Sequence, residues 1–340
     1  MANYPFRHGI AARLLVGVVI CCVIGGCTAG AGATKTAEDT AQAKASAEAS
    51  AEASTKASAE AHAKAMKKLS PAEIMAAADQ AARGGDYERA VGLYNVAIEV
   101  QPSSELWYRV AWIYSHLGKK QLAADAFLMT LQYDPSHAQA HEELGLLYLE
   151  NKQREKAAAH FRKAVESDPQ RWRSHNALGV LADTAHDYGV AIGHYQAALA
   201  VKPDSGQVLN NLGYSHYLAG NLDEAELSYE QALVWEPGNR AVRVNMGLLY
   251  ARRGNYERAV EIMGAAMNKA KAHNDVGYVA FQNGDMETAE QLLREAIRLS
   301  PSYYETAHQN LERMHRAQAD EAQQITQKET ADKARAVAAR

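Results

Sequence analysis

The sequence predicts an all-α solenoid of about seven helix-turn-helix repeats followed by a C-terminal capping helix. The leading observation is an alanine that recurs at intervals of 30 to 34 residues. Its positions are Ala90, Ala123, Ala157, Ala191, Ala225, Ala259 and Ala289. Self-similarity at such a period is typical of repeat proteins, in which each unit buries its apolar face against its neighbours.

Each alanine belongs to a helix whose buried face can be followed in the sequence. Four residues after it comes a bulky side chain, at Tyr94, Phe127, Phe161, Tyr195, Tyr229, Met263 and Leu293. Three residues further comes a small one, at Ala97, Thr130, Ala164, Ala198, Ala232, Ala266 and Ala296. Offsets of four and three place all three residues on one face of a helix. Proline then ends most units, at Pro102, Pro135, Pro169, Pro203, Pro237 and Pro301, because it cannot continue a helix.

A second helical pattern precedes each of these helices. Its small column is Ala78, Ala111, Gly145, Gly179, Gly213, Gly247 and Gly277. Glycine inside a helix costs up to about 1 kcal/mol relative to alanine, so we expect the paired helix to approach closely at that column. The turns that follow contain glycines suited to the left-handed C-cap conformation, at Gly85, Gly118, Gly220, Gly254 and Gly284.

Together these columns resemble the tetratricopeptide repeat from about Ser70 to Met314. The resemblance implies a right-handed solenoid, which we place at residues 69–316. The sixth unit is four residues short and lacks its closing proline near Lys271, so a change of curvature is expected there. The closing helix is predicted from Tyr304, Ala307, Leu311 and Met314, and residues 317–340 are predicted to be a polar tail that frays.

The N-terminus has the features of a secretory signal over residues 1–26. Arg7 and Arg13 are followed by an apolar run from Leu14 to Ile24, which is short for a membrane span. Ile24-Gly25-Gly26-Cys27 resembles a bacterial lipobox, which implies cleavage before Cys27 and its acylation by fatty acids such as palmitate. The alternative is an ordinary signal peptide with an incidental cysteine. Since Thr28 and not aspartate follows Cys27, the resemblance implies an outer-membrane location facing the periplasm.

Residues 27–68 are predicted to be a flexible tether. The segment is nearly all Ala, Ser, Thr, Glu and Lys, as in KASAEASAEASTKASAEAHAKA, and without large apolar groups it cannot form a core. Loss of the signal would leave 34 basic against 40 acidic residues, a net charge of −6. Because a phosphate backbone requires a basic face, nucleic acid is not an expected partner.

The sequence shows no catalytic, cofactor or metal motif. There is neither a glycine-rich phosphate loop nor a nucleophile elbow, so a non-enzyme is expected. His141, His175 and His273 share one column and His216 lies in another. None of these four forms the close pair expected of a zinc site, and we expect them to pack or hydrogen-bond between helices.

In tetratricopeptide proteins the first helix of each pair lines a concave surface that commonly receives peptides or proteins. Asparagine amides there can bond an extended backbone and aromatic rings can supply contact area. Asn211, Asn245 and Asp275 share a column and are predicted to form a ladder. The alternative is that Asn caps local backbone groups and Tyr packs between repeats. By analogy with the family, the partner-binding residues are Tyr108, Trp112, Asn176, Asn210, Asn211, Tyr214, Tyr217, Asn245, Asn274, Asp275, Tyr278 and Phe281.

Residues 175–233, including NNLGYSHYLAGNLDEAELSYEQAL, and residues 274–314, including NDVGYVAFQNGDMETAEQLLREAI, resemble the lipoproteins of tight-adherence (Flp-type) pilus assembly. That resemblance implies a pilotin-like accessory factor that helps the secretin or other assembly proteins localise. The alternative is a periplasmic adaptor that recruits or regulates cell-wall hydrolases. Both would use the same anchor and the same surface, so the sequence leaves the two functions open.

Overall fold

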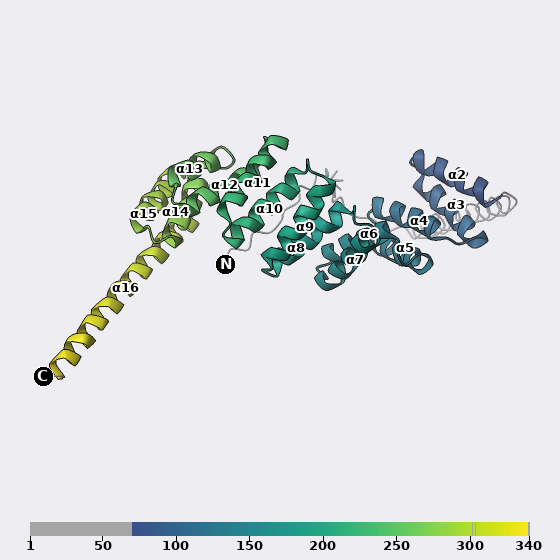
Figure 1. The fold of residues 1–340 in the computed structure, drawn as a ribbon. Coiled ribbons are helices and arrows are strands. Elements are labelled where there is room, and N and C mark those ends of the chain that lie inside the picture. The colour runs from purple at the N-terminus through teal and green to yellow at the C-terminus, as the bar shows by residue number, and fades with distance from the viewer. Residues whose placement is uncertain (1–69, 301, 303, 339–340) are drawn as a thin grey trace, which may run out of the picture. The chain divides into compact units, whose positions relative to one another are not determined.

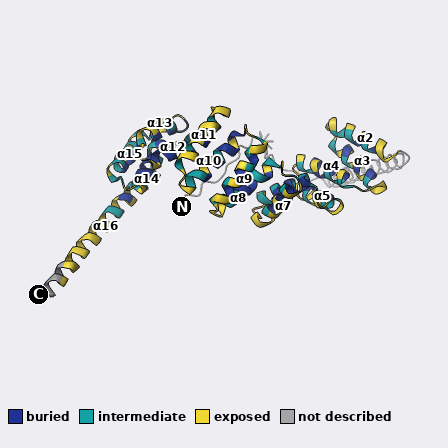
Figure 2. Ribbon diagram, in the orientation of Figure 1, coloured by how far each residue is buried: buried dark blue, intermediate teal, exposed yellow. Residues whose placement is uncertain are grey.

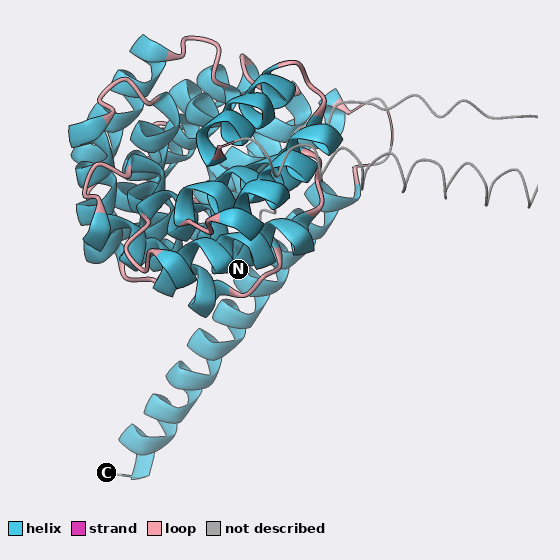
Figure 3. Cartoon of the chain, turned by 90° about the vertical axis from the view of Figure 1, so that its right-hand side faces the viewer, coloured by secondary structure: helices cyan, strands magenta, loops and turns pink. Residues whose placement is uncertain are grey.

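The computed structural model describes residues 70–300, 302 and 304–338, and every regular element among them is an α-helix (Figure 1 and Figure 3). The predicted signal at residues 1–26, the predicted tether at residues 27–68 and Cys27, which is predicted to be acylated, lie outside the described residues, as does Pro301. Their assignments therefore stay predictions.

Seven helical hairpins make up residues 71–299. Their first helices are α2 (Pro71–Arg83), α4 (Ser104–His116), α6 (Ala138–Glu150), α8 (Trp172–Thr184), α10 (Gly206–Ala219), α12 (Arg240–Arg252) and α14 (Lys269–Gln282). Their second helices are α3 (Tyr87–Val100), α5 (Lys120–Tyr133), α7 (Arg154–Ser167), α9 (Tyr188–Val201), α11 (Leu222–Trp235), α13 (Tyr256–Gly264) and α15 (Met286–Leu299). Each second helix packs on its own first helix and on the first helix of the next hairpin. This sequential stacking confirms the predicted solenoid.

Local capping sets where the helices begin and end. Ser70 starts α2 with a capping box, in which its hydroxyl accepts from the Glu73 N–H and the Glu73 carboxylate accepts from the Ser70 N–H. The five glycines predicted for the turns all adopt the left-handed conformation, with φ between 71° and 88°. In the third and fourth hairpins Lys152 and His186 take that conformation instead, with φ of 60° and 61°.

The small column of the first helices faces the bulky column of the second helices, as the sequence predicts. A β-carbon added at Gly179 would lie 2.5 Å from Cε1 of Tyr195, and one at Gly145 would lie 2.6 Å from Cε1 of Phe161. Tyr195 and Phe161 are almost completely buried. Figure 2 shows such buried residues along the inner faces of the hairpins. Glycine is therefore required because an aromatic ring fills the space beside its α-carbon.

The sixth hairpin has a shorter second helix than the others, which accounts for the missing residues in its sequence. α13 has only nine residues, and α14 begins directly after the N-cap Asn268, whose side chain accepts from the Ala270 N–H. The contact between α12 and α14 is also more extensive than that between other successive first helices. A short second helix thus brings the neighbouring first helices together.

The final helix, α16, runs from Glu305 to Ala338. Ala307 and Met314 are fully buried, and Met314 joins the cluster formed by Leu293 and Ala280, so the predicted cap is present. The helix then continues through residues 317–338, where the sequence predicts fraying. Its composition explains the difference, since Ala, Glu, Gln, Lys and Arg are all good helix formers. Side chains 319–332 of this extension are exposed (Figure 2).

Candidate protein-binding face

The twelve residues predicted to bind a partner all lie on first helices. They are carried by α4, α8, α10, α12 and α14. Trp112 and Tyr214 are the most exposed, with 46% and 39% of their surface accessible, whereas Asn274 is buried at 3%. The remaining nine are half-buried. We call this set the first-helix face.

Asparagine side chains join successive first helices across this face. The amide of Asn211 on α10 donates to the side-chain oxygen of Asn176 on α8 at 3.0 Å. The amide of Asn245 on α12 donates to Asn210 on α10 at 2.9 Å. These bonds form a ladder, in which each hydrogen bond, or rung, joins two asparagines that are 35 residues apart. The predicted ladder differs, because Asn211, Asn245 and Asp275 occupy the same repeat position and do not bond to one another.

A third rung lies at the C-terminal end of the stack. The amide of Asn310 on α16 donates to Asn274 at 3.0 Å, and the amide of Asn274 donates to Asp275 at 3.0 Å. Asn310 is absent from the predicted set because it lies on the cap and outside the repeat register. Its position 36 residues after Asn274 is the signal that could have identified it.

The ladder leaves hydrogen-bonding capacity on the face. A primary amide carries two N–H donors and an oxygen with two lone pairs. Each rung consumes one donor of Asn211 or Asn245 and one acceptor site of its neighbour. Since both donating residues are half-buried, their remaining groups can meet the backbone of an extended segment lying across the first helices.

Aromatic rings flank the ladder on α10 and α14. Tyr214 and Tyr217 stack with their ring centroids 6.2 Å apart and an interplanar angle of 20°. Arg252 covers Tyr217, with its guanidinium 5.0 Å from the ring centroid, and donates to the Tyr217 carbonyl at 2.7 Å. Tyr278 and Phe281 form a second pair, with ring centroids 6.3 Å apart and an interplanar angle of 60°. Rigid rings of this kind supply contact area at low entropic cost.

A hollow of about 380 Å³ opens between α2 and α4. Trp112 lines it and stacks on His116, with centroids 5.4 Å apart and an angle of 9°. Arg109 crosses it to bond Asp79 at 2.5 Å. Tyr108 also lines the hollow, but its ring stacks on His137 at 4.8 Å, so packing between repeats accounts for much of its position.

Three carboxylates on the first helices α6, α8 and α14 are partly withdrawn from water. Burial raises the pKa of Asp183 and of Asp275, and burial together with the neighbouring Glu142 raises the pKa of Glu143. Asp183 accepts hydrogen bonds from the hydroxyls of Tyr195 at 2.8 Å and Ser215 at 2.6 Å. These two donors stabilise the anion and oppose the effect of burial.

The next repeat lacks the counterpart of Asp183. Tyr229 occupies the position of Tyr195, but Tyr217 stands where Asp183 stands one repeat earlier. The Tyr229 hydroxyl is buried and has no hydrogen-bond partner among the described residues. Desolvation accordingly keeps its pKa far above the usual value, so the hydroxyl stays protonated.

His141 and His175 hydrogen-bond between helices, as expected, but the partner of each is a second histidine that was not predicted. Nδ1 of His141 lies 2.9 Å from Nδ1 of His160, and Nδ1 of His175 lies 3.4 Å from Nδ1 of His194. His273 instead bonds the Lys269 carbonyl. Within the described residues no group of three or more His, Cys, Asp or Glu side chains could hold a metal ion. The second histidine follows the first by 19 residues in both repeats, a pattern that the sequence does contain.

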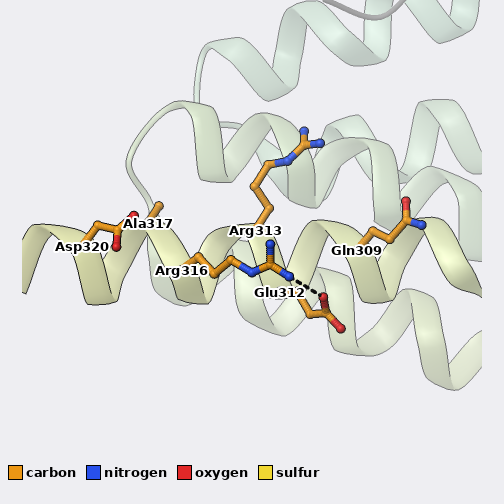
Figure 4. Close-up of a pocket in the computed structure, with 6 residues that line it drawn as sticks. All are labelled: Gln309, Glu312, Arg313, Arg316, Ala317 and Asp320. Atoms are coloured by element: carbon orange, nitrogen blue, oxygen red, sulfur yellow. Dashed lines mark hydrogen bonds and ion pairs between the residues drawn. The ribbon is translucent and has the colours of Figure 1, made fainter.

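Figure 4 shows a second hollow, which lies along α16. All six lining residues belong to that one helix, and Arg316 pairs with Glu312 at 3.1 Å. No other element of the described chain lines it. It therefore has the character of an exposed helix surface, unlike the hollow between α2 and α4.

Three models of the tetratricopeptide repeat match this arrangement of hairpins. One matches residues 75–132, 118–171 and 176–242, a second matches residues 217–277, and a third matches residues 270–303. The chain belongs to the tetratricopeptide repeat family. Tetratricopeptide repeats are protein-interaction scaffolds, and this is the function that the family assigns to the chain.

Solved tetratricopeptide structures share the fold. The C-terminal part of a repeat protein from Cytophaga hutchinsonii is 18% identical over 70% of this chain and 99% of its own, with a TM-score of 0.51. YrrB, described as having an unusual peptide-binding site, is 22% identical over 54% and 95%, with a TM-score of 0.49. The pilF protein of Pseudomonas aeruginosa is 20% identical over 63% and 97%, with a TM-score of 0.47. At these identities the likeness concerns the fold alone.

None of the helices in the described part of the chain combines the length and the apolar content that a membrane crossing needs.

Proposed function

We propose that this chain is a lipid-anchored scaffold of the outer membrane that binds an extended segment of a partner protein along its first-helix face. The observation that carries the proposal is the conjunction on α8, α10 and α12 of amide rungs with an exposed tyrosine pair. The amides offer donors and acceptors at a spacing set by the repeat, and Tyr214 offers an accessible ring. An extended chain presents backbone groups and side chains that match these two kinds of contact.

The predicted anchor and tether would attach this scaffold to the membrane and set its distance from the lipid surface. Acylation of Cys27 by several fatty-acid chains, each methylene contributing about 0.8 kcal/mol, would hold the protein stably at the membrane. Residues 27–68 would then let the repeats reach a partner at some distance from the lipid surface. The sequence before and after Cys27 supports this part of the proposal.

The partner system that we propose is the tight-adherence (Flp-type) pilus, in which the chain acts as a pilotin-like accessory factor for the secretin or another assembly protein. The support is the resemblance of residues 175–233 and 274–314 to the lipoproteins of that system. The alternative function is an adaptor for cell-wall hydrolases, which would use the same face. Capture of such hydrolases would replace the pilus proposal.

The experiment is crosslinking in living cells followed by affinity capture and mass spectrometry, comparing the parent chain with a Tyr214→Ala, Asn211→Ala double variant. Val234→Ala is the matched control, because Val234 is 74% exposed but lies on the second helix α11. We expect a secretin or pilus-assembly protein to be enriched with the parent and the control and lost with the double variant. Recovery of wall hydrolases, or of partners that the double variant retains, would overturn the pilus assignment. A large fall in Tm of the double variant would show that these side chains stabilise the repeats and would move the test to Tyr214→Ala alone.

A further inference from the structure

The third and fourth hairpins each contain a histidine pair that bridges their two helices. His141 on α6 faces His160 on α7, and His175 on α8 faces His194 on α9. The two pairs occupy the same repeat positions, 34 residues apart. In the first hairpin those positions hold Ile74 and Leu93, which are 0% and 4% exposed. Apolar packing therefore satisfies this site in the first hairpin, so the fold does not require imidazoles there.

The far nitrogen of the first histidine is fixed by the backbone. Nε2 of His141 lies 3.0 Å from the carbonyl oxygen of Pro135. Because a carbonyl can only accept, Nε2 carries the proton and the Nδ1 lone pair points toward His160. His175 is hydrogen-bonded to the backbone of Pro169 in the same way. A ligating histidine is commonly oriented by this contact, in which its second ring nitrogen donates to a carbonyl.

The spacing of the facing nitrogens suits one shared ion. Two nitrogen ligands at 2.0–2.1 Å from a tetrahedral zinc ion lie about 3.3 Å apart. The observed Nδ1–Nδ1 distances are 2.9 Å and 3.4 Å, so the two nitrogens of each pair lie close to this separation, and each ring would tilt to aim its lone pair at the ion. His160 would shift its proton from Nδ1 to Nε2, which releases no proton overall. Tyr148 stacks on the His160 ring at 5.3 Å and 24°, which limits its rotation.

We propose that each histidine pair chelates one divalent transition-metal ion of the class that prefers imidazole, such as Zn²⁺. The chain supplies two nitrogen ligands to each ion, and water completes the coordination, since no third protein ligand is near. Imidazole must be neutral to bind, and an ordinary imidazole, with a pKa of about 6.5, is neutral at pH 7.5. Occupancy would crosslink α6 to α7 and α8 to α9 in the middle of the solenoid.

Calorimetric titration of the purified full-length chain with zinc sulfate at pH 7.5, after removal of metal with EDTA, tests the proposal. The variants are His160→Leu, His194→Leu and the double variant. Leucine is chosen because Leu93 occupies the equivalent position in the first hairpin. His273→Ala is the matched control, because His273 shares the column of His141 and His175 but has no second imidazole opposite it.

We expect two ions per chain for the parent and the control, one for each single variant and none for the double variant. Saturating zinc should raise the Tm of the parent by about 3 °C or more, as ligand binding to the folded state requires, and leave that of the double variant unchanged. Absence of binding to the parent would overturn the proposal, as would the same stoichiometry in the double variant. Circular dichroism establishes that each variant retains its helicity.

Discussion

At the scale of single residues, the fourth and fifth hairpins differ in the hydrogen bonding of one buried tyrosine. The Tyr195 hydroxyl donates to Asp183, whereas the Tyr229 hydroxyl has no partner among the described residues because Tyr217 replaces the aspartate. The repeat register predicts that both tyrosines are buried. It does not predict which of them is satisfied, since that depends on a side chain one helix away. For His141 and His175 the sequence predicts a contact between helices but not that its partner is a second histidine.

Phenylalanine substitution should therefore have opposite effects at these two positions. Tyr195→Phe removes a bond to a carboxylate and should destabilise the fold by about 1–3 kcal/mol. Tyr229→Phe removes a buried hydroxyl without a partner and should be neutral or stabilising by up to about 1 kcal/mol. Urea denaturation followed by circular dichroism measures both. Equal destabilisation by the two substitutions would show that the Tyr229 hydroxyl is satisfied in solution.

At the scale of helices, periodicity predicted nearly the whole arrangement. Small and bulky columns at fixed offsets identified the seven hairpins, and the five turn glycines adopt the expected left-handed conformation. The extension of α16 beyond Met314 was not predicted, because a polar segment without a buried face gives no periodic signal. Its helical structure instead follows from residue propensity.

A pair of glycines in the fourth hairpin tests the close-packing argument. Gly179→Ala should destabilise by about 1–3 kcal/mol, because the added methyl group would overlap the buried Tyr195 ring. Gly193→Ala, on the partner helix α9, should stabilise by about 0.5–1 kcal/mol, since its added carbon would have no atom within 4 Å apart from its chain neighbours and the nearby backbone of its own helix. Thermal unfolding distinguishes them. A neutral Gly179→Ala would mean that the two helices are farther apart than described.

At the scale of the whole molecule, buried histidines should make stability depend on pH. Burial lowers the pKa of His160 to about 4 and lowers the pKa of His175 and of His194. An unfolded histidine titrates near 6.5. Between these values the unfolded chain binds more protons than the folded chain, so stability should fall as the pH falls from about 6.5 toward 4.

The urea midpoint at pH 7 and at pH 5, with EDTA present, measures this dependence. The parent should be less stable at pH 5, and the His160→Leu, His194→Leu variant should show a smaller difference. Asp183, Asp275 and Glu143 act in the opposite direction, because their raised pKa values favour the folded state as they protonate. An unchanged pH dependence in the variant would assign the effect to other groups.

The first-helix face is the proposed binding site for a partner protein, and a photo-crosslinking residue placed there tests this proposal most directly. The crosslinker would replace Tyr214 on α10 in one strain and Val234 on α11 in another, both positions being exposed. Irradiation of living cells should yield a discrete adduct with one partner protein from position 214 and none from position 234. An adduct from position 234 with none from position 214 would show that partners bind the second helices, and the claim would be wrong.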